Sequence, residues 1–161
     1  MEILAITTAS VLSMFMNMTA VNNNSNHFLY NADMENGTVN TIYAYNREQG
    51  GKVLSAKTKY DYSYDGMNRV QTKTKYVFVG GKWKLDSKVN FTYEPDQTTV
   101  DFQAWNGKGF DEVSERTVYK TLGNDVLGIN QYKWFTTGIK LIDSYMMIHS
   151  DMETLLAQTL R

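Results

Sequence analysis

The sequence contains no cysteine and only one proline, Pro95, in 161 residues. The absence of cysteine excludes a disulfide framework, a thiol nucleophile, a cysteine-based metal site and lipid attachment through a thiol. The scarcity of proline leaves no proline-rich linker, and the length fits a single domain. If the protein is exported, it does without disulfides.

The chain also lacks an excess of either charge and has little histidine. Its net charge of −1 creates no field that would favour nucleic acid or an anionic membrane surface. The two histidines, His27 and His149, stand far apart, and their spacing indicates neither a metal triad nor a nucleophile–base pair. The motifs GxSxG and GxGxxG and the P-loop are missing. We therefore expect no catalytic residue, metal site, cofactor or nucleic-acid partner, and we expect that the protein is not an enzyme.

What the sequence does contain is a regular alternation of apolar and polar residues, clearest between Tyr60 and Tyr93. It is broken only at Asp65-Gly66 and at Gly80-Gly81, which are typical of tight hairpins. Successive side chains of a strand point to opposite faces, so each strand is expected to have one apolar and one polar face. The pattern predicts three antiparallel strands, over residues 54–64, 70–78 and 83–93. The polar face would collect a ladder of lysines, namely Lys57, Lys59, Lys73, Lys75, Lys84 and Lys88.

Turn residues at even spacing predict further strands on both sides of this stretch. Their expected ranges are 39–47, 98–105, 110–120, 126–135 and 139–148. All connections are short, which predicts an all-β fold: an antiparallel meander of about eight long strands in consecutive hairpins. A flat sheet with one bare apolar face would be too weak to offset the lost chain entropy. We therefore expect a meander that is strongly twisted or partly closed, as a barrel or a sandwich.

The N-terminal segment, residues 1–20, is predicted to be a secretory signal peptide, because it is mildly apolar and carries no charge after Glu2. Cleavage is expected after Ala20. The absence of a basic residue before the apolar run, and the large Met18 near the cleavage point, speak against a signal. The alternative is an amphipathic helix that stays in the fold and packs on the sheet.

The remaining segments divide the chain around the sheet. Residues 21–38 are expected to be a linker, in which 27–30 could form a short strand and 31–37 is rich in turn residues. The β-meander domain covers residues 39–149. The tail, residues 150–161, predicts a short C-terminal helix that could cover the apolar face of the sheet.

Tryptophans beside turns are the strongest indication of a binding site. Trp105 precedes the Asn106-Gly107 turn, and Trp134 stands close to Thr136-Thr137. Flat rings at the rim of a sheet can stack on sugars or anchor a partner protein. The alternative is that both rings close the ends of the apolar face. Trp83 lies within the alternating pattern and is expected in the core.

Charged side chains offer two weaker hypotheses. Lys57, Lys59, Lys73 and Lys75 could bind a polyanion, although lysines on open faces and edges also keep sheets from pairing with other chains. Carboxylates on the polar faces could act as a glycosidase pair. None stands among apolar neighbours, as a buried general acid would, so we interpret them as a solvated surface. These carboxylates are Asp61, Asp86, Asp101, Asp111, Glu112 and Glu115.

Short sequence runs resemble known families. The run YDYSYDGMNRV, residues 60–70, resembles the YD-repeat hairpin, in which a tyrosine–aspartate step precedes a glycine turn and an arginine. Together with GGKWKLDS, FTYE and WNGKGFDE, this run makes the chain similar to a Bacteroidetes family of small secreted proteins of unknown function. That resemblance implies export and an all-β fold, and it brings no activity, cofactor or catalytic residue.

These observations favour an exported, non-catalytic β-domain that binds a glycan or an envelope protein. We expect it to be secreted or periplasmic, with no membrane span in the mature chain. A small hydrolase that uses carboxylates, and a structural or self-assembling envelope subunit, are the alternatives.

Overall fold

The computed structural model of the protein describes residues 5–21, 28–47, 52–123 and 126–148. Within these residues one helix, α1 (Thr8–Val21), precedes nine strands. The strands are β1 (Phe28–Glu35), β2 (Thr38–Arg47), β3 (Leu54–Tyr64), β4 (Val70–Val79), β5 (Lys82–Glu94), β6 (Gln97–Ala104), β7 (Glu115–Gly123), β8 (Val126–Phe135) and β9 (Gly138–Ile148). No helix in the described ranges is long and apolar enough to cross a membrane.

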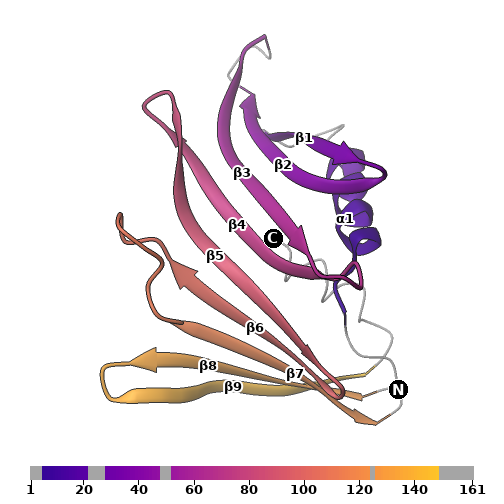
Figure 1. Ribbon diagram of the computed structural model, residues 1–161, viewed down its shortest axis with the longest axis vertical. Helices are drawn as coiled ribbons and strands as arrows, with labels where there is room; N and C mark the ends of the chain where they lie inside the picture. The colour runs from indigo at the N-terminus through magenta and orange to yellow at the C-terminus, as the bar shows by residue number, and fades with distance from the viewer. Residues whose placement is uncertain (1–4, 22–27, 48–51, 124–125, 149–161) are drawn as a thin grey trace.

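The strands form one sheet whose order in space is their order in the sequence (Figure 1). Every neighbouring pair is antiparallel, so each connection joins adjacent strands. Gly80 and Gly81 both have positive φ and form the two-residue turn between β4 and β5 that the sequence pattern predicts. The predicted antiparallel meander is therefore confirmed.

Two strand boundaries differ from those predicted. Residues 31–37 are rich in turn formers, yet β1 continues through Glu35 and turns only at Asn36-Gly37, where both φ angles are positive. Hydrogen bonding to β2 overrides the local turn preference. β7 begins at Glu115 and not at residue 110, because residues 105–114 form a longer connection that donates backbone hydrogen bonds to β5 and β6.

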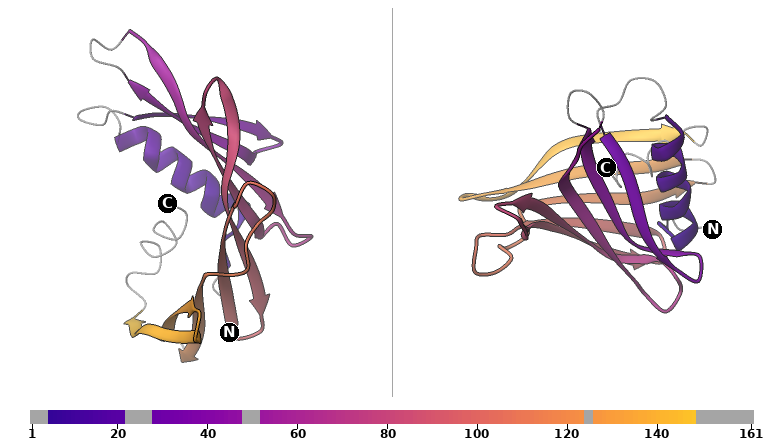
Figure 2. Two further views of the ribbon diagram at one scale, coloured as in Figure 1. Left: turned by 90° about the vertical axis from the view of Figure 1, so that its left-hand side faces the viewer. Right: turned by 90° about the horizontal axis from the view of Figure 1, so that it is seen from above.

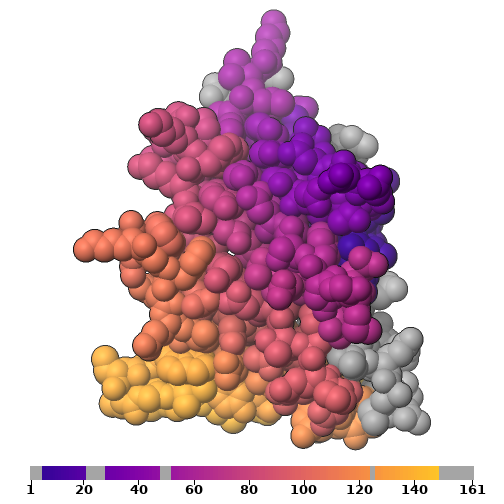
Figure 3. Space-filling view, viewed as in Figure 1, coloured from indigo at the N-terminus to yellow at the C-terminus, as the bar shows by residue number. Residues whose placement is uncertain are grey.

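The sheet is strongly twisted and open, and α1 lies on its concave side (Figure 2). Register shifts interrupt six of the eight strand pairs, and an extra residue in one strand of a pair increases the local twist. We call the side that packs against α1 the helix face, and the opposite side the outer face. The outer face is the one that Figure 3 presents.

The main core lies between α1 and the helix face of the first strands. Val11 and Met14 of α1 are buried there in one cluster with Ile42, Val70 and Phe91. A second, smaller cluster lies further along the same face, on β7 and β8, and consists of Tyr119, Leu127 and Ile129.

Backbone hydrogen bonds also join the N-terminal segment to the sheet. Val70 donates its N–H to the carbonyl oxygen of Ile6 at 2.7 Å. Thr7 and Ser10 cap α1 reciprocally, since each hydroxyl oxygen accepts the backbone N–H of the other residue. This arrangement is the second interpretation of residues 1–20, a helix that packs on the sheet. Cleavage after Ala20 stays a prediction, and the predicted C-terminal helix falls outside the described residues.

Register shifts redistribute the lysines between the two faces. An extra residue in β4, Gln71, sets Lys73 directly opposite Tyr62 of β3. Residues opposite one another in an antiparallel pair point to the same face, so Lys73 shares the helix face with this tyrosine. Lys75 and Lys84 also lie on the helix face, whereas Lys59 and Lys88 lie on the outer face. The prediction of one polar face that collects all the lysines is therefore wrong.

Candidate functional site

All three tryptophans lie on the outer face, the side that α1 leaves uncovered. An extra residue in β5, Asp86, reverses the alternation there, so that Trp83 faces Phe78 of β4 and not the core. The prediction that Trp83 is a core residue is wrong for this reason. Trp105 directly follows β6 and lies on the outer side of the sheet. Trp134 lies on the same face, on β8.

Four rings form a row across β2 to β5, which we call the ring row: Tyr43, Tyr45, Phe78 and Trp83. The centroids of Phe78 and Trp83 are 5.0 Å apart in an edge-on arrangement, and Trp83 lies 6.1 Å from Tyr43. Tyr43 stacks in turn on Tyr45 at 6.4 Å. Phe78 is exposed and the other three are half-buried, so their neighbours hold them in place while part of each ring faces outward.

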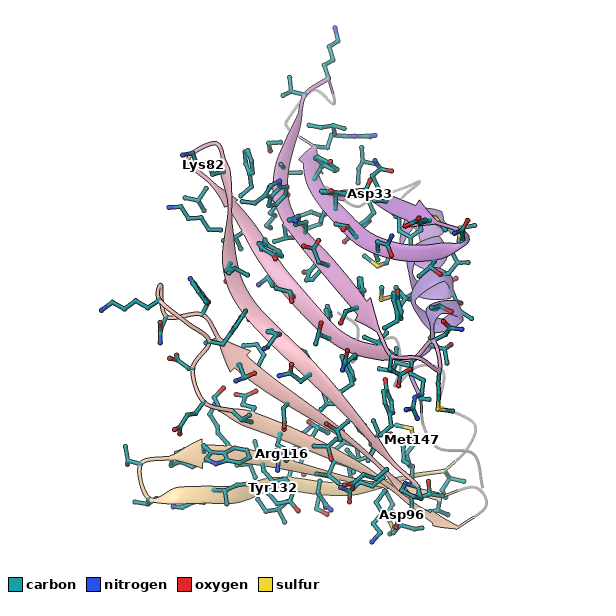
Figure 4. All side chains as sticks on the ribbon, in the orientation of Figure 1. Asp33, Lys82, Asp96, Arg116, Tyr132 and Met147 are labelled. Carbon is teal, nitrogen blue, oxygen red and sulfur yellow. The ribbon has the colours of Figure 1, made fainter. Side chains whose placement is uncertain are left out.

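Charged groups flank the ring row. The hydroxyl of Tyr43 donates to Oδ2 of Asp33 at 2.7 Å, and this hydrogen bond, with partial burial, raises the pKa of Tyr43 to about 12. Figure 4 shows Asp33 on β1 at this end of the sheet. Lys59 lies on the same face, on β3. Its Nζ is 3.0 Å from Asp61 and 4.2 Å from the centre of the Tyr76 ring. Rings and hydrogen-bonding groups therefore alternate across this surface.

A second aromatic group lies in the connection between β6 and β7. Trp105 packs edge-on against Phe110 with centroids 5.2 Å apart, and Nζ of Lys88 lies 4.5 Å from the centre of the Phe110 ring. The amide of Asn106 donates to Asp111 at 2.6 Å, and its oxygen accepts N–H groups of the same turn. The turn that precedes Phe110 is thus fixed by its own side chains.

A third group joins β6, β7 and β8. Arg116 donates two hydrogen bonds to Asp101, at 2.6 and 2.8 Å, and these raise the pKa of the arginine. Its guanidinium carbon lies 5.3 Å from the centre of the Trp134 ring. Tyr132 is opposite Arg116 in the register, and Figure 4 shows the two on neighbouring strands. The carboxylate therefore fixes the arginine, and the arginine covers one side of Trp134.

The four lysines predicted to bind a polyanion do not form one patch. Lys59 lies on the outer face, and Lys73 and Lys75 lie on the helix face. Lys57 falls at a register shift in β3 and reaches an aromatic ring of β1 at 4.4 Å. Lys75 forms an ion pair with Asp86 at 3.0 Å. A shared binding role for these lysines is not supported by their placement.

Lys73 is the most unusual titratable group of the helix face. It is buried, and its Nζ lies 4.8 Å from the centre of the Tyr60 ring. Burial, together with the nearby charge of Lys75, lowers the pKa of Lys73 to about 8. Opposite it, Tyr62 is buried with no hydrogen-bond partner for its hydroxyl in the described structure, and burial raises the pKa of that phenol far above its usual range.

The carboxylates considered for acid–base catalysis are mostly paired with basic side chains. Asp61 pairs with Lys59, Asp101 with Arg116, and Glu115 with Lys133 at 3.0 Å. Among the described residues no group of three or more histidines and carboxylates could hold a metal ion. Paired surface carboxylates of this kind are typical of solvated ion pairs.

The tyrosine–aspartate hairpin has a clear structural basis. Asp65 accepts the backbone N–H groups of Met67 and Arg69, and Arg69 donates to its second oxygen at 2.7 to 2.8 Å. The arginine lowers the pKa of Asp65. Across the sheet, Arg69 also lies 4.4 Å from the centre of the Tyr93 ring. The motif therefore closes the β3–β4 hairpin and anchors it to β5.

The sequence pattern predicts Trp105 and Trp134 as aromatic residues at the rim of the sheet but misses the ring row. Tyr43, Phe78 and Trp83 sit within alternating segments, where a ring is normally assigned to the apolar face. Only the extra residues at the register shifts move them to the outer face, and no residue type marks those positions in the sequence.

Comparison with known proteins gives the same fold and a family. Residues 2–121 match the family described as "Family of unknown function (DUF3836)". The chain belongs to the DUF3836 family. This result confirms the predicted resemblance to a Bacteroidetes family of unknown function. No curated protein matches the chain.

Solved structures resemble this DUF3836 chain. A protein of unknown function from Bacteroides fragilis NCTC 9343 is 25% identical with a TM-score of 0.66, over 78% of this chain and 95% of its own. A DUF3836 family protein from Bacteroides vulgatus ATCC 8482 is 24% identical with a TM-score of 0.50, over 53% of this chain and 89% of its own. Both are similar in fold, and neither description names an activity.

Proposed function

We propose that this DUF3836 protein is an exported, non-catalytic β-domain that binds an extended glycan on its outer face. The observation that carries the proposal is the ring row of Tyr43, Tyr45, Phe78 and Trp83, together with Trp105 and Trp134 on the same side of the sheet. Half-buried rings on a rigid sheet cost little conformational entropy when a ligand stacks on them.

The groups beside the rings favour a sugar as the ligand. A pyranose offers C–H groups to a ring face and hydroxyls at its edge, so its site needs rings with donors and acceptors beside them. Asp33 lies beside Tyr43, and Asn90 donates to Gln103 at 2.7 Å on the outer face between the aromatic groups. Sugar hydroxyls could make further hydrogen bonds to the remaining donor and acceptor positions of these groups.

The distribution of rings favours a chain of sugars over a single unit. Aromatic groups occur on the outer face from β2 to β8, which are separated by six strand intervals. At about 4.8 Å per interval this span is roughly 29 Å along a flat path, before the curvature of the sheet is considered. Several weak stacking contacts along one polymer add affinity without a deep pocket.

The proposed export is consistent with a glycan as the ligand. The N-terminal segment has the composition of a secretion signal, and the family resemblance implies export. A secreted or periplasmic protein of a gut-type bacterium would meet polysaccharides at the cell envelope. The proposed localisation and the proposed ligand are therefore consistent with each other.

Affinity electrophoresis against a panel of soluble plant, microbial and host polysaccharides tests the proposal. We expect retardation in at least one gel, and Trp83→Ala should weaken that binding by about tenfold or more. Lys84→Ala changes an exposed lysine of the helix face and should leave binding unchanged. Retardation in no gel, or retardation that Trp83→Ala does not reduce, would contradict the proposal.

A further inference from the structure

The last strand of the sheet, β9, is a long edge with exposed apolar side chains. Among the described strands it pairs with β8 alone, so the hydrogen-bonding groups of its other side face away from the sheet. All of its residues except Met147 are exposed. The apolar residues exposed on it are Ile139, Leu141, Ile142, Tyr145, Met146 and Ile148. Figures 1 and 3 show this strand along one margin of the sheet.

The opposite edge, β1, is protected in the usual ways. It is shorter than β9, carries a register shift after Asp33 and ends in exposed Met34 and Glu35. It also lies beside α1, whose residues pack against Tyr30 and Ala32. Short length, charge and cover are devices that keep sheet edges from pairing with other chains. β9 has a register shift at Ile142 and two charges, as β1 does, but it is longer, and among the described residues it lies outside the cluster that α1 covers.

The two charges on β9 are of opposite sign and lie on one face. Lys140 is opposite Lys133, and Asp143 is opposite Gln131, so both side chains point to the helix face. Neither forms an ion pair within the described part of the chain. In a two-fold antiparallel pairing centred between them, each lysine would meet the aspartate of the other copy. The edge is therefore complementary in charge to itself.

We infer that β9 is the contact surface for a second copy of this chain. Two β9 strands would pair antiparallel about a two-fold axis that passes between Lys140 and Asp143. Leu141 and Ile142 of each copy would meet at the centre, and the two Lys140–Asp143 pairs would lie to either side. The pairing joins two open sheets into one continuous sheet and covers apolar side chains that the monomer exposes.

This pairing has a consequence for binding, which rests on the proposed function. A two-fold axis perpendicular to the sheet keeps both outer faces on the same side. The dimer would present two ring rows to one polymer, and a polymer bound by both would dissociate more slowly than from one. The association itself requires no glycan, so it can fail or hold independently of glycan binding.

Light scattering during size-exclusion chromatography of the full chain tests the inference. We expect a mass about twice the 18.5 kDa of the chain. Leu141→Lys, which puts a charge at the centre of the edge, should give a mass of one chain. Met67→Lys changes another exposed apolar residue, in the β3–β4 hairpin, and should leave the dimer intact. Circular dichroism of both variants verifies that they are folded.

A charge exchange shows whether the partner is a copy of the same edge. Lys140→Asp alone and Asp143→Lys alone should each give monomers, because like charges then meet. An equimolar mixture of the two variants should recover the dimer, since every pair becomes opposite in sign again. A wild-type chain that is monomeric in solution overturns the inference. This holds whether hydrogen exchange shows the backbone amides of β9 to be open to solvent or protected by another part of the same chain. Dimers that neither Leu141→Lys nor the single charge changes disturb also overturn it.

Discussion

Two tyrosines on neighbouring positions of the helix face differ in one hydrogen bond. Tyr64 donates its hydroxyl to the carbonyl oxygen of Val39 at 2.6 Å, whereas the buried hydroxyl of Tyr62 has no partner in the described structure. Burial of a polar group without a hydrogen bond destabilises the folded state, and a hydrogen bond to the buried group offsets part of that cost. The same deletion should therefore have opposite effects at the two sites.

We predict that Tyr62→Phe raises the free energy of unfolding by about 1 kcal/mol and that Tyr64→Phe lowers it by about the same amount. Urea unfolding followed by circular dichroism measures both. Equal losses of stability in the two variants would show that the hydroxyl of Tyr62 has a partner.

Lys73 is expected to make the stability of the folded protein depend on pH, and the lowered pKa of this lysine sets the direction of that dependence. Its pKa is lowered by burial from 10.5 to about 8 in the folded chain. Between these values the unfolded chain holds a proton that the folded chain has released, so stability rises with pH across this window. Below pH 8 both states are protonated and the cost of the buried charge is fully present.

We predict that Lys73→Met raises the free energy of unfolding at pH 7 by about 2 kcal/mol and removes the rise in stability between pH 8 and 10. Lys84→Met, at an exposed lysine of β5, is the control and should keep the rise. Urea titrations at a series of pH values measure the effect. A wild-type stability that stays flat or falls from pH 8 to 10 would contradict the assignment.

At the scale of elements, α1 is the cover of the main core. Met14 is 7% exposed among the core residues, whereas Met16, two positions later, is 58% exposed. Removal of a buried methionine side chain leaves a cavity, and removal of an exposed one does not.

In the unprocessed chain we predict that Met14→Ala lowers the free energy of unfolding by about 3 kcal/mol and that Met16→Ala changes it by less than about 0.5 kcal/mol. Chemical denaturation of the two variants in parallel gives both values. If Met14→Ala were as mild as Met16→Ala, α1 would not be part of the cooperative core.

The strands could be predicted from the sequence because their signals are local. Alternation defines residues 54–94 as three strands, and Gly80-Gly81 marks the turn between two of them. β1 was harder to predict, because its hydrogen bonds to β2 override the turn-forming residues it contains. The extra residues at Gln71 and Asp86 could not be predicted, since nothing in their composition distinguishes them from ladder residues.

The same extra residues decide how much of the site could be predicted. Trp105 and Trp134 stand beside turns, so their position at the rim of the sheet follows from local sequence, but the face on which they lie does not. The face on which Trp83 lies depends on the register of β5 against β4. That register is a property of the strand pair and not of either strand alone. The ring row, formed by rings of three strands, therefore becomes visible only when the sheet is assembled.

At the scale of the whole molecule, the two faces have different roles. The helix face holds α1 and the buried clusters, and the outer face carries the aromatic groups with their charged neighbours. An open sheet can keep one face for stability and offer the other to a ligand. Glycan binding by the outer face is the central claim, and its location can be tested on individual side chains.

Hydroxyl-radical footprinting with and without the polysaccharide selected by affinity electrophoresis is the most direct test. Oxidation of exposed side chains is read residue by residue by mass spectrometry. In the unprocessed chain we predict that Tyr43, Phe78 and Trp83 become protected in the complex, while Met16 on α1 keeps its reactivity. Protection confined to α1 and the helix face, with the ring row unchanged, would contradict the proposal that the outer face binds the glycan.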